Sequence, residues 1–200
     1  MAFPRLTTRF AAAMQFAFEL HVDQMRKGTD TPYLAHLLAV TALVLENGGD
    51  EDQAIAALLH DAAEDQGGRE VLAIIRERFG ERVAAIVDGC TDTYESPKPP
   101  WRSRKEAYIA HLLHASVDIR LVSLADKVHN ARSILADLQQ YGEAVWDRFQ
   151  GGRDGTLWYY KTLAEVFREI DASPLVGELT RLTLEIERIA IQNESVPERG

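Results

Sequence analysis

Apolar side chains recur along most of this chain at the spacing of an α-helix. In many segments they stand three, four and seven residues apart, which places them on one face of a helix. In residues 5–26, for example, Phe10, Ala13, Met14 and Ala17 carry this repeat. We find no run of alternating apolar and polar residues long enough for a half-buried strand. The pattern therefore predicts an all-α protein.

Glycine, proline and short polar residues divide the pattern into separate helices. The clearest breaks fall at 26–32, 47–50, 66–68 and at three prolines between 97 and 100. The predicted helices cover residues 5–26, 33–46, 51–65, 69–79, 81–92, 104–114, 117–138, 156–170 and 174–191, with a short helix around 143–149 as an option. We expect a single bundle of eight or nine helices.

The length and composition of the chain agree with one ordinary globular domain. Its 200 residues are 46% hydrophobic and 26% charged. We expect residues 1–192 to form the domain and residues 193–200 to be a frayed tail. There is no apolar run approaching a membrane span, no signal-peptide pattern and a single cysteine, Cys90. These features predict a cytoplasmic protein without a membrane partner.

The charge distribution favours a small phosphorylated ligand over a nucleic acid. The formal net charge of −9 is unfavourable for nucleic-acid binding, which needs a basic surface. The densest basic cluster is formed by Lys98, Arg102, Arg104 and Lys105. This segment is either a phosphate-binding loop or a solvated flexible loop.

Four ionisable groups are crowded at the end of the predicted helix 51–65. His60 and Glu64 stand four residues apart, as do Asp61 and Asp65, and no Lys or Arg lies within this turn. Three carboxylates without a basic neighbour favour a bound cation, and a divalent metal ion fits best. The alternative is an acidic, solvated helix face.

Two further side chains on other predicted helices suit the same site. His36 shares the apolar face of helix 33–46, so its imidazole points inward, and Asp126 begins a polar stripe on helix 117–138. This stripe, which continues with His129, Asn130 and Ser133, suits either a site or a buried hydrogen-bond network. Two imidazoles and two carboxylates form a ligand set for Mn²⁺, Fe²⁺, Co²⁺ or Zn²⁺. We expect His129 to be a hydrogen-bonded neighbour rather than a ligand.

The order of these residues resembles the His…His-Asp…Asp signature of the HD-domain metal phosphohydrolases. Three segments are similar to motifs of the RelA/SpoT-type hydrolases and the stand-alone small alarmone hydrolases: Arg-Lys…Pro-Tyr…His in 26–36, Leu-His-Asp-x-x-Glu-Asp in 59–65 and Leu-Ala-Asp-Lys-x-x-Asn-x-Arg in 124–132. The residues Trp158-Tyr159-Tyr160 also resemble a late aromatic helix of the stand-alone members. The similarity extends over about residues 10–170.

This resemblance implies an activity and a role for each residue that matches a motif. The reaction would be metal-dependent removal of the 3′-pyrophosphate from guanosine tetra- or pentaphosphate (ppGpp or pppGpp), giving GDP or GTP and pyrophosphate. One metal ion, Mn²⁺ in this branch with Zn²⁺, Fe²⁺ and Co²⁺ as alternatives, would be bound by His36, His60, Asp61 and Asp126. Glu64 and Asp65 would position and deprotonate the attacking water. The substrate would contact Arg26, Lys27, Asn130, Arg132 and Ser133, together with Lys98, Arg102 and Arg104 of the basic cluster.

Two other functions fit the same motifs. The first is an HD phosphohydrolase that acts on another nucleotide, for example a 2′-phosphatase on NADPH or a nucleotidase. The second is a non-catalytic nucleotide sensor or an antitoxin-like partner. A sensor has no need of a water-activating pair, so the presence of Glu64 and Asp65 favours an enzyme.

Overall fold

The computed structural model describes residues 5–194, and their regular structure is helical, as predicted. These residues contain no strand, and their only isolated β-bridge joins Met25 and Pro32. The helices, in order, are α1 (Thr8–His21), α2 (Leu34–Glu46), α3 (Glu51–Leu59), α4 (Ala62–Gln66), α5 (Gly68–Phe79), α6 (Glu81–Cys90), α7 (Trp101–Leu112), α8 (Val117–Tyr141), the 3-10 helix η1 (Gly142–Arg148), α9 (Gly152–Ile170) and α10 (Pro174–Glu194). Of the predicted frayed tail, residues 193 and 194 belong to α10, and residues 195–200 lie outside the described residues.

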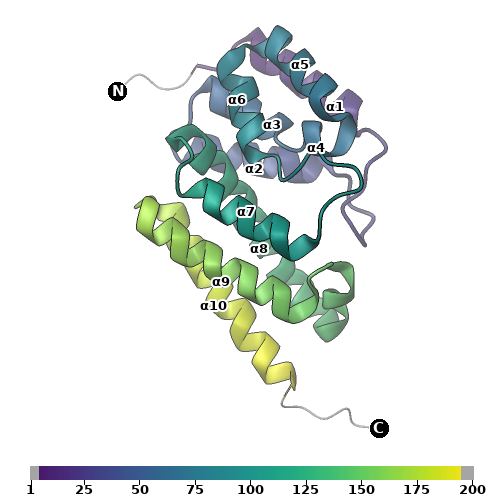
Figure 1. The fold of residues 1–200 in the computed structure, drawn as a ribbon, viewed down its shortest axis with the longest axis vertical. Helices are drawn as coiled ribbons and strands as arrows, with labels where there is room; N and C mark the ends of the chain where they lie inside the picture. The colour runs from purple at the N-terminus through teal and green to yellow at the C-terminus, as the bar shows by residue number, and fades with distance from the viewer. Residues whose placement is uncertain (1–4, 195–200) are drawn as a thin grey trace.

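The long helix α8 links the two parts of the bundle. Figure 1 shows α1–α6 on one side, and α9 and α10 on the other, with α7 and α8 between them. α8 packs against α2, α3 and α6 as well as against α10. Its buried face includes Leu124, Ala125 and Val128, which repeat with helical spacing. One helix can therefore present polar residues at the boundary between the two parts.

The central helix differs from the sequence prediction. A continuous helix over 51–65 was wrong, because α3 ends at Leu59 and α4 begins at Ala62. His60 and Asp61 form the turn between them, and Asp61 has φ −96° and ψ −4°. The sequence has no glycine or proline at this turn, and the apolar residues keep their helical spacing across it. The pattern therefore predicted one continuous helix. Because of this break, the side chains of His60 and Asp61 point in other directions than they would in a continuous helix.

The basic cluster also differs from its predicted loop. α7 begins at Trp101 rather than near residue 104, immediately after Pro100. Proline is well suited to the start of a helix, since the first backbone N–H groups have no partner within the helix. Arg102, Arg104 and Lys105 therefore lie in the first turns of α7, where their directions are fixed by the helix.

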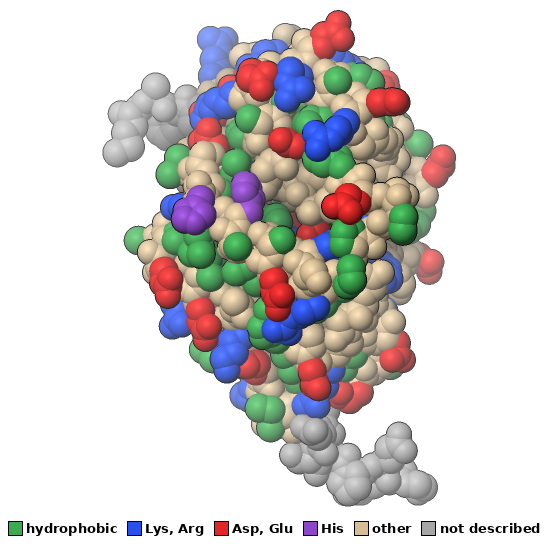
Figure 2. All heavy atoms as spheres, viewed as in Figure 1, with side chains coloured by type: hydrophobic (Ala, Val, Ile, Leu, Met, Phe, Trp, Pro, Cys, Tyr) green, Lys and Arg blue, Asp and Glu red, His purple; other side chains and the backbone are tan. Residues whose placement is uncertain are grey.

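The surface combines charges of both signs. In Figure 2, acidic, basic and hydrophobic side chains are interspersed over one face, and a recess opens near its middle. Among residues 5–194, no helix combines the length and the apolar character that crossing a membrane requires.

Candidate metal centre and adjoining pocket

Three buried side chains from separate segments meet at one point. His36 on α2, His60 in the α3–α4 turn and Asp126 on α8 each offer a ligand atom, and these atoms all lie within 4.8 Å of one another. The Oδ1 atom of Asp126 is 3.2 Å from Nε2 of His36 and 3.7 Å from Nε2 of His60. The structure thus brings together three of the four predicted metal ligands in a compact group.

The fourth predicted ligand, Asp61, lies beside this group. Its Oδ2 atom is 3.0 Å from Nε2 of His60 and 3.7 Å from Nε2 of His36. The same oxygen accepts a hydrogen bond of 2.5 Å from the hydroxyl of Tyr33. Both imidazoles therefore face carboxylates on two sides, one from the α3–α4 turn and one from α8.

The hydrogen bond made by Nδ1 of His60 directs its Nε2 atom at the two carboxylates. Its Nδ1 lies 2.8 Å from the carbonyl oxygen of Ala57, which can only accept, so Nδ1 carries a proton. Its Nε2 is buried and has no hydrogen-bond partner among the described residues. A buried polar atom without a partner is costly. A metal ion would satisfy it, so the residues present fit a divalent cation.

His36 is held by a second imidazole. Its Nδ1 lies 2.8 Å from Nδ1 of His129, which confirms the prediction that His129 is a hydrogen-bonded neighbour. Burial and the charges of His36 and Arg26 lower the pKa of His129 to about 4. A neutral His129 can accept the Nδ1 proton of His36, which leaves Nε2 of His36 directed at the centre. Metal-bound histidines are commonly oriented by such a second hydrogen bond.

The carboxylates of the centre carry negative charge and favour the binding of a cation. Burial alone would raise the pKa of Asp126, but Lys127 and the two imidazoles hold it well below its ordinary value. Burial alone would lower the pKa of His60, but Asp61 and Asp126 raise it well above its ordinary value. Both shifts have the same physical cause: the buried carboxylates attract positive charge, which either a proton or a metal ion can provide.

Side chains of α8 connect the centre to the space beside it. Nδ2 of Asn130 donates to Oδ1 of Asp126 at 2.5 Å, and Nζ of Lys127 lies 2.6 Å from Oδ2 of the same carboxylate. Oδ1 of Asn130 in turn accepts from Nη2 of Arg26 at 3.0 Å. Arg26 therefore reaches the edge of the metal centre through Asn130.

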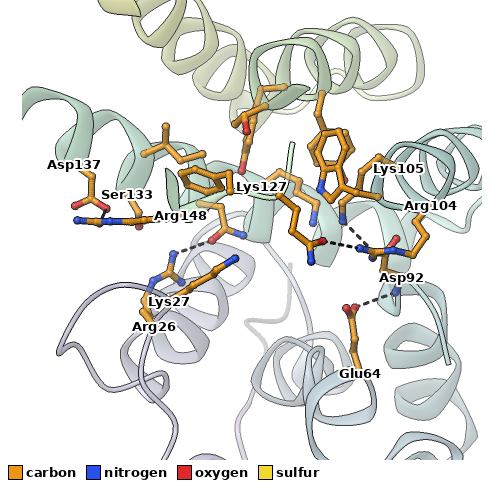
Figure 3. A pocket seen from close by; sticks show the side chains of 18 of the residues that line it. Arg26, Lys27, Glu64, Asp92, Arg104, Lys105, Lys127, Ser133, Asp137 and Arg148 are labelled. Carbon is orange, nitrogen blue, oxygen red and sulfur yellow. Dashed lines mark hydrogen bonds and ion pairs between the residues drawn. The ribbon is translucent and has the colours of Figure 1, made fainter. Parts of the chain in front are cut away.

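A pocket of about 440 Å³ adjoins these residues, which is within the usual range for small-molecule sites. Figure 3 shows its side chains, which come from both parts of the bundle. Six of the eight predicted substrate-binding residues line it: Arg26, Lys27, Lys98, Arg104, Asn130 and Ser133. The predicted substrate site is thus largely assembled in one cavity next to the candidate metal ligands.

Arg102 and Arg132, the other two predicted substrate-binding residues, do not line the pocket. The guanidinium of Arg102 lies 3.2 Å from the ring centroid of Trp158, and Nε pairs with Glu106 at 2.8 Å. Arg132 pairs with Glu178 on α10 at 2.7 Å. Because both are engaged on the surface of the bundle, we leave them out of the candidate site.

The two predicted water-activating carboxylates are placed differently. Glu64 lines the pocket, where Oε1 lies 2.7 Å from Nζ of Lys98 and Oε2 accepts the backbone N–H of Asp92 at 3.2 Å. Asp65 does not line the pocket, and its Oδ2 accepts a hydrogen bond from Gln24 at 2.9 Å. Glu64 is therefore the better placed of the two to meet a molecule in the pocket.

Sequence reasoning gave no substrate role to several residues of the pocket. Lys105 belonged to the basic cluster and Lys127 to the Asp126 motif, but neither was assigned a contact. Arg148 of η1 also lines the pocket and pairs with Asp137 at 2.9 Å. Nothing in the sequence near Arg148 pointed to it, because its place depends on how η1 packs against α8.

These features define a class: an all-α protein with a buried His, His and Asp centre that opens on a basic pocket. Comparison with protein families agrees, since the model of the HD domain matches residues 13–157. The chain therefore belongs to the HD-domain family. The family membership inferred from the motifs and the all-α fold predicted from the apolar pattern are both confirmed. Membership implies that the centre binds a divalent metal ion.

Similar proteins place the chain near one branch of that family. It is 39% identical over 125 residues to a Xenopus tropicalis protein named guanosine-3′,5′-bis(diphosphate) 3′-pyrophosphohydrolase MESH1, covering 61% of this chain and 67% of that protein. It is 37% identical over 135 residues to an Aquifex aeolicus protein named guanosine-3′,5′-bis(diphosphate) 3′-pyrophosphohydrolase, covering 66% of this chain and only 18% of that protein. A solved structure described as a metazoan ortholog of SpoT that hydrolyzes ppGpp superposes with a TM-score of 0.71 at 27% identity, covering 96% of this chain and 99% of that one.

Proposed function

We propose that this protein is a metal-dependent hydrolase that removes the 3′-pyrophosphate of guanosine 3′,5′-bis(diphosphate) and of the corresponding pentaphosphate. The observation that carries the proposal is the direct contact between the candidate metal centre and a basic pocket, through Asp126, Lys127 and Asn130. The names of the relatives support the choice of substrate. We place the protein in the cytoplasm, which its single cysteine, Cys90, favours.

We assign His36, His60, Asp61 and Asp126 to one divalent ion. Their mixed nitrogen and oxygen donors suit Mn²⁺, which is our first choice, with Zn²⁺, Fe²⁺ and Co²⁺ as alternatives. When bound, such an ion lowers the pKa of a water molecule and neutralises phosphate charge. His129 and Tyr33 orient two of the proposed ligands by their hydrogen bonds to His36 and Asp61.

The reaction needs a base beside the attacked phosphorus, and we assign this role to Glu64. The oxygen of water forms a bond to the phosphorus that carries the 3′ oxygen, and the bond between that phosphorus and the 3′ oxygen breaks. Glu64 takes a proton from the water and passes it to the 3′ oxygen, so that GDP leaves with a 3′ hydroxyl. Lys98 pairs with Glu64 at 2.7 Å and holds its carboxylate at the wall of the pocket. Asp65, whose Oδ2 accepts a hydrogen bond from Gln24, would assist it.

The nucleoside end of the substrate would lie against the loop that follows α1. Arg26 and Lys27 come from this loop, and Asn130 and Ser133 face it from α8. The guanidinium of Arg26 is already oriented by Asn130, which reduces the entropy lost when a ligand binds. These four residues offer hydrogen-bond donors and two positive charges for the base, the ribose and the 5′ phosphates.

The proposal is tested by turnover of guanosine 3′,5′-bis(diphosphate) with purified, Mn²⁺-loaded protein. We expect equal amounts of GDP and pyrophosphate, separated by chromatography and identified by mass. A panel containing NADPH and nucleoside triphosphates serves as the control for specificity. Release of inorganic phosphate from NADPH in preference to this reaction, or tight binding of the guanine nucleotide without turnover, would contradict the proposal.

Lys105 predicts how activity depends on pH. Burial and the nearby charge of Lys127 lower its pKa to about 8, although Glu64, Asp92 and Asp126 are also close. The amine is therefore charged below pH 8 and neutral above it, so kcat/KM for an anionic substrate should fall as pH rises through 8. Steady-state rates between pH 7 and 9.5 measure this.

The control for this pH dependence is Lys105→Arg, because a guanidinium keeps its charge throughout the range. The decline above pH 8 should be absent from this variant. An unchanged decline would assign the titration to another group in the pocket.

A further inference from the structure

The charged residues of the pocket fall into two groups. Figure 3 shows Arg26, Lys27 and Arg148 on one side and Arg104 and Lys105 on the other, with Lys127 between the groups. The first group comes from the loop after α1 and from η1, and the second from the start of α7. A substrate with phosphates at two ends could therefore place one end in each group.

Arg104 of the second group and Lys98, which also lines the pocket, are already committed to other partners. The guanidinium of Arg104 is engaged by the carboxylate of Asp92, the carbonyl oxygen of Pro99 and the side chain of Gln150. Lys98 pairs with Glu64 at 2.7 Å. Arg104 therefore has few donors left for a ligand, and it positions Asp92 and the start of α7.

Lys105 has the weakest hold on its partner. Its Nζ lies 3.2 Å from Oδ2 of Asp92, an oxygen that it shares with Arg104. It also lies 5.3 Å from the ring centroid of Tyr159, and only 19% of its side chain is exposed. The largely buried amine of Lys105 is therefore only partly neutralised by Asp92, and an anion bound in the pocket would complete the neutralisation.

Lys127 extends this charge to the metal centre. Its Nζ is 2.6 Å from Oδ2 of Asp126, whose other oxygen faces His36 and His60. Lys127 and Lys105 line the same pocket, so their positive charges repel each other there. An anion bound by both would relieve this repulsion.

We propose that Lys105 and Lys127 form the subsite for the terminal phosphate of the 3′-pyrophosphate, the phosphate that water does not attack. This inference rests on the proposed function, which places the attacked phosphate at the metal centre. Lys127 contacts Asp126 of that centre, whereas Lys105 pairs with Asp92, so a diphosphate would bind across both amines and a monophosphate would bind at the centre alone. The subsite would thus select a pyrophosphate over a single phosphate at the 3′ position.

Product binding tests the subsite separately from turnover. Binding of inorganic pyrophosphate and of GDP is measured by calorimetry on the metal-loaded protein at a fixed concentration of free metal. Lys105→Met should weaken pyrophosphate binding about tenfold or more, since a hydrogen bond to a charged group is lost. Its affinity for GDP should stay within about twofold, because distant sites behave independently.

Lys27→Met is the matched control at the opposite side of the pocket. Lys27→Met should weaken the binding of GDP and leave the affinity for pyrophosphate within about twofold of the wild-type value. Lys105→Arg, which restores the charge, should recover most of the pyrophosphate affinity. Lys127 is left unchanged in this test, because its removal would also disturb Asp126.

The outcomes separate the two proposals. If Lys105→Met binds pyrophosphate as the wild type does, or loses GDP and pyrophosphate equally while remaining folded by circular dichroism, the subsite is overturned. A second outcome is that the wild type fails to turn over guanosine 3′,5′-bis(diphosphate), while Lys105→Met weakens pyrophosphate binding and Lys105→Arg restores it. In that case the proposed reaction fails and the diphosphate subsite stands.

Discussion

Replacing Asp126 with asparagine is expected to abolish metal binding and to lower turnover of guanosine 3′,5′-bis(diphosphate) by about 100-fold or more. Asp126 lies on α8 and contacts both imidazoles, at 3.2 and 3.7 Å. An amide is nearly the same size as a carboxylate, but it carries no charge and binds divalent metal ions weakly. The measurements are the metal content after dialysis and kcat/KM at saturating Mn²⁺.

The control for this variant is Asp154→Asn, an exposed acidic residue in the first turn of α9. It removes the same charge without touching the centre, so both metal content and rate should stay at the wild-type level. Asp126→Asn also leaves Lys127 without its carboxylate, and thermal unfolding shows whether the variant is folded. A folded Asp126→Asn protein that keeps its metal and its rate would remove Asp126 from the ligand set.

The second large effect is expected for Glu64→Gln. Loss of a general base typically slows a reaction by about 10²–10⁴-fold, and a glutamine cannot accept the proton from water. Glu64 lines the pocket but is not one of the three residues of the compact metal group. We therefore expect kcat to fall while the metal remains bound, which distinguishes this variant from Asp126→Asn.

Glu70→Gln provides the matched control for Glu64→Gln, since Glu70 is exposed in the first turn of α5. Asp65→Gln and Asp65→Asn should have smaller effects than Glu64→Gln, because Asp65 does not line the pocket. A kcat for Glu64→Gln close to that of the wild type would assign proton transfer to another group.

The fold class was predictable from the sequence because the helices are amphipathic and their breaks contain glycine or proline. The division between α3 and α4 was not, since residues 51–65 contain neither and keep the helical spacing. Two hydrogen bonds stabilise this turn: a local one between Nδ1 of His60 and the carbonyl oxygen of Ala57, and a tertiary one from the hydroxyl of Tyr33 to Asp61. The prediction failed at the place where the candidate site departs from regular structure, as is common at functional sites.

The candidate ligands were predictable because each lies in a recognisable motif. Motifs carry no information about which long side chains reach a common cavity. Arg102 and Arg132 had the expected charge, yet they turn toward Trp158 and Glu178. Arg148 reaches the pocket only because η1 packs against α8, a contact between segments that sequence spacing does not specify.

The central claim is that one divalent ion is shared by side chains from α2, the α3–α4 turn and α8. Anomalous X-ray scattering from crystals grown with Mn²⁺ tests it most directly. We predict one peak per chain, at about 2.0–2.3 Å from His36, His60, Asp61 and Asp126. A manganese peak elsewhere, with these four side chains bound only to one another, would contradict the account.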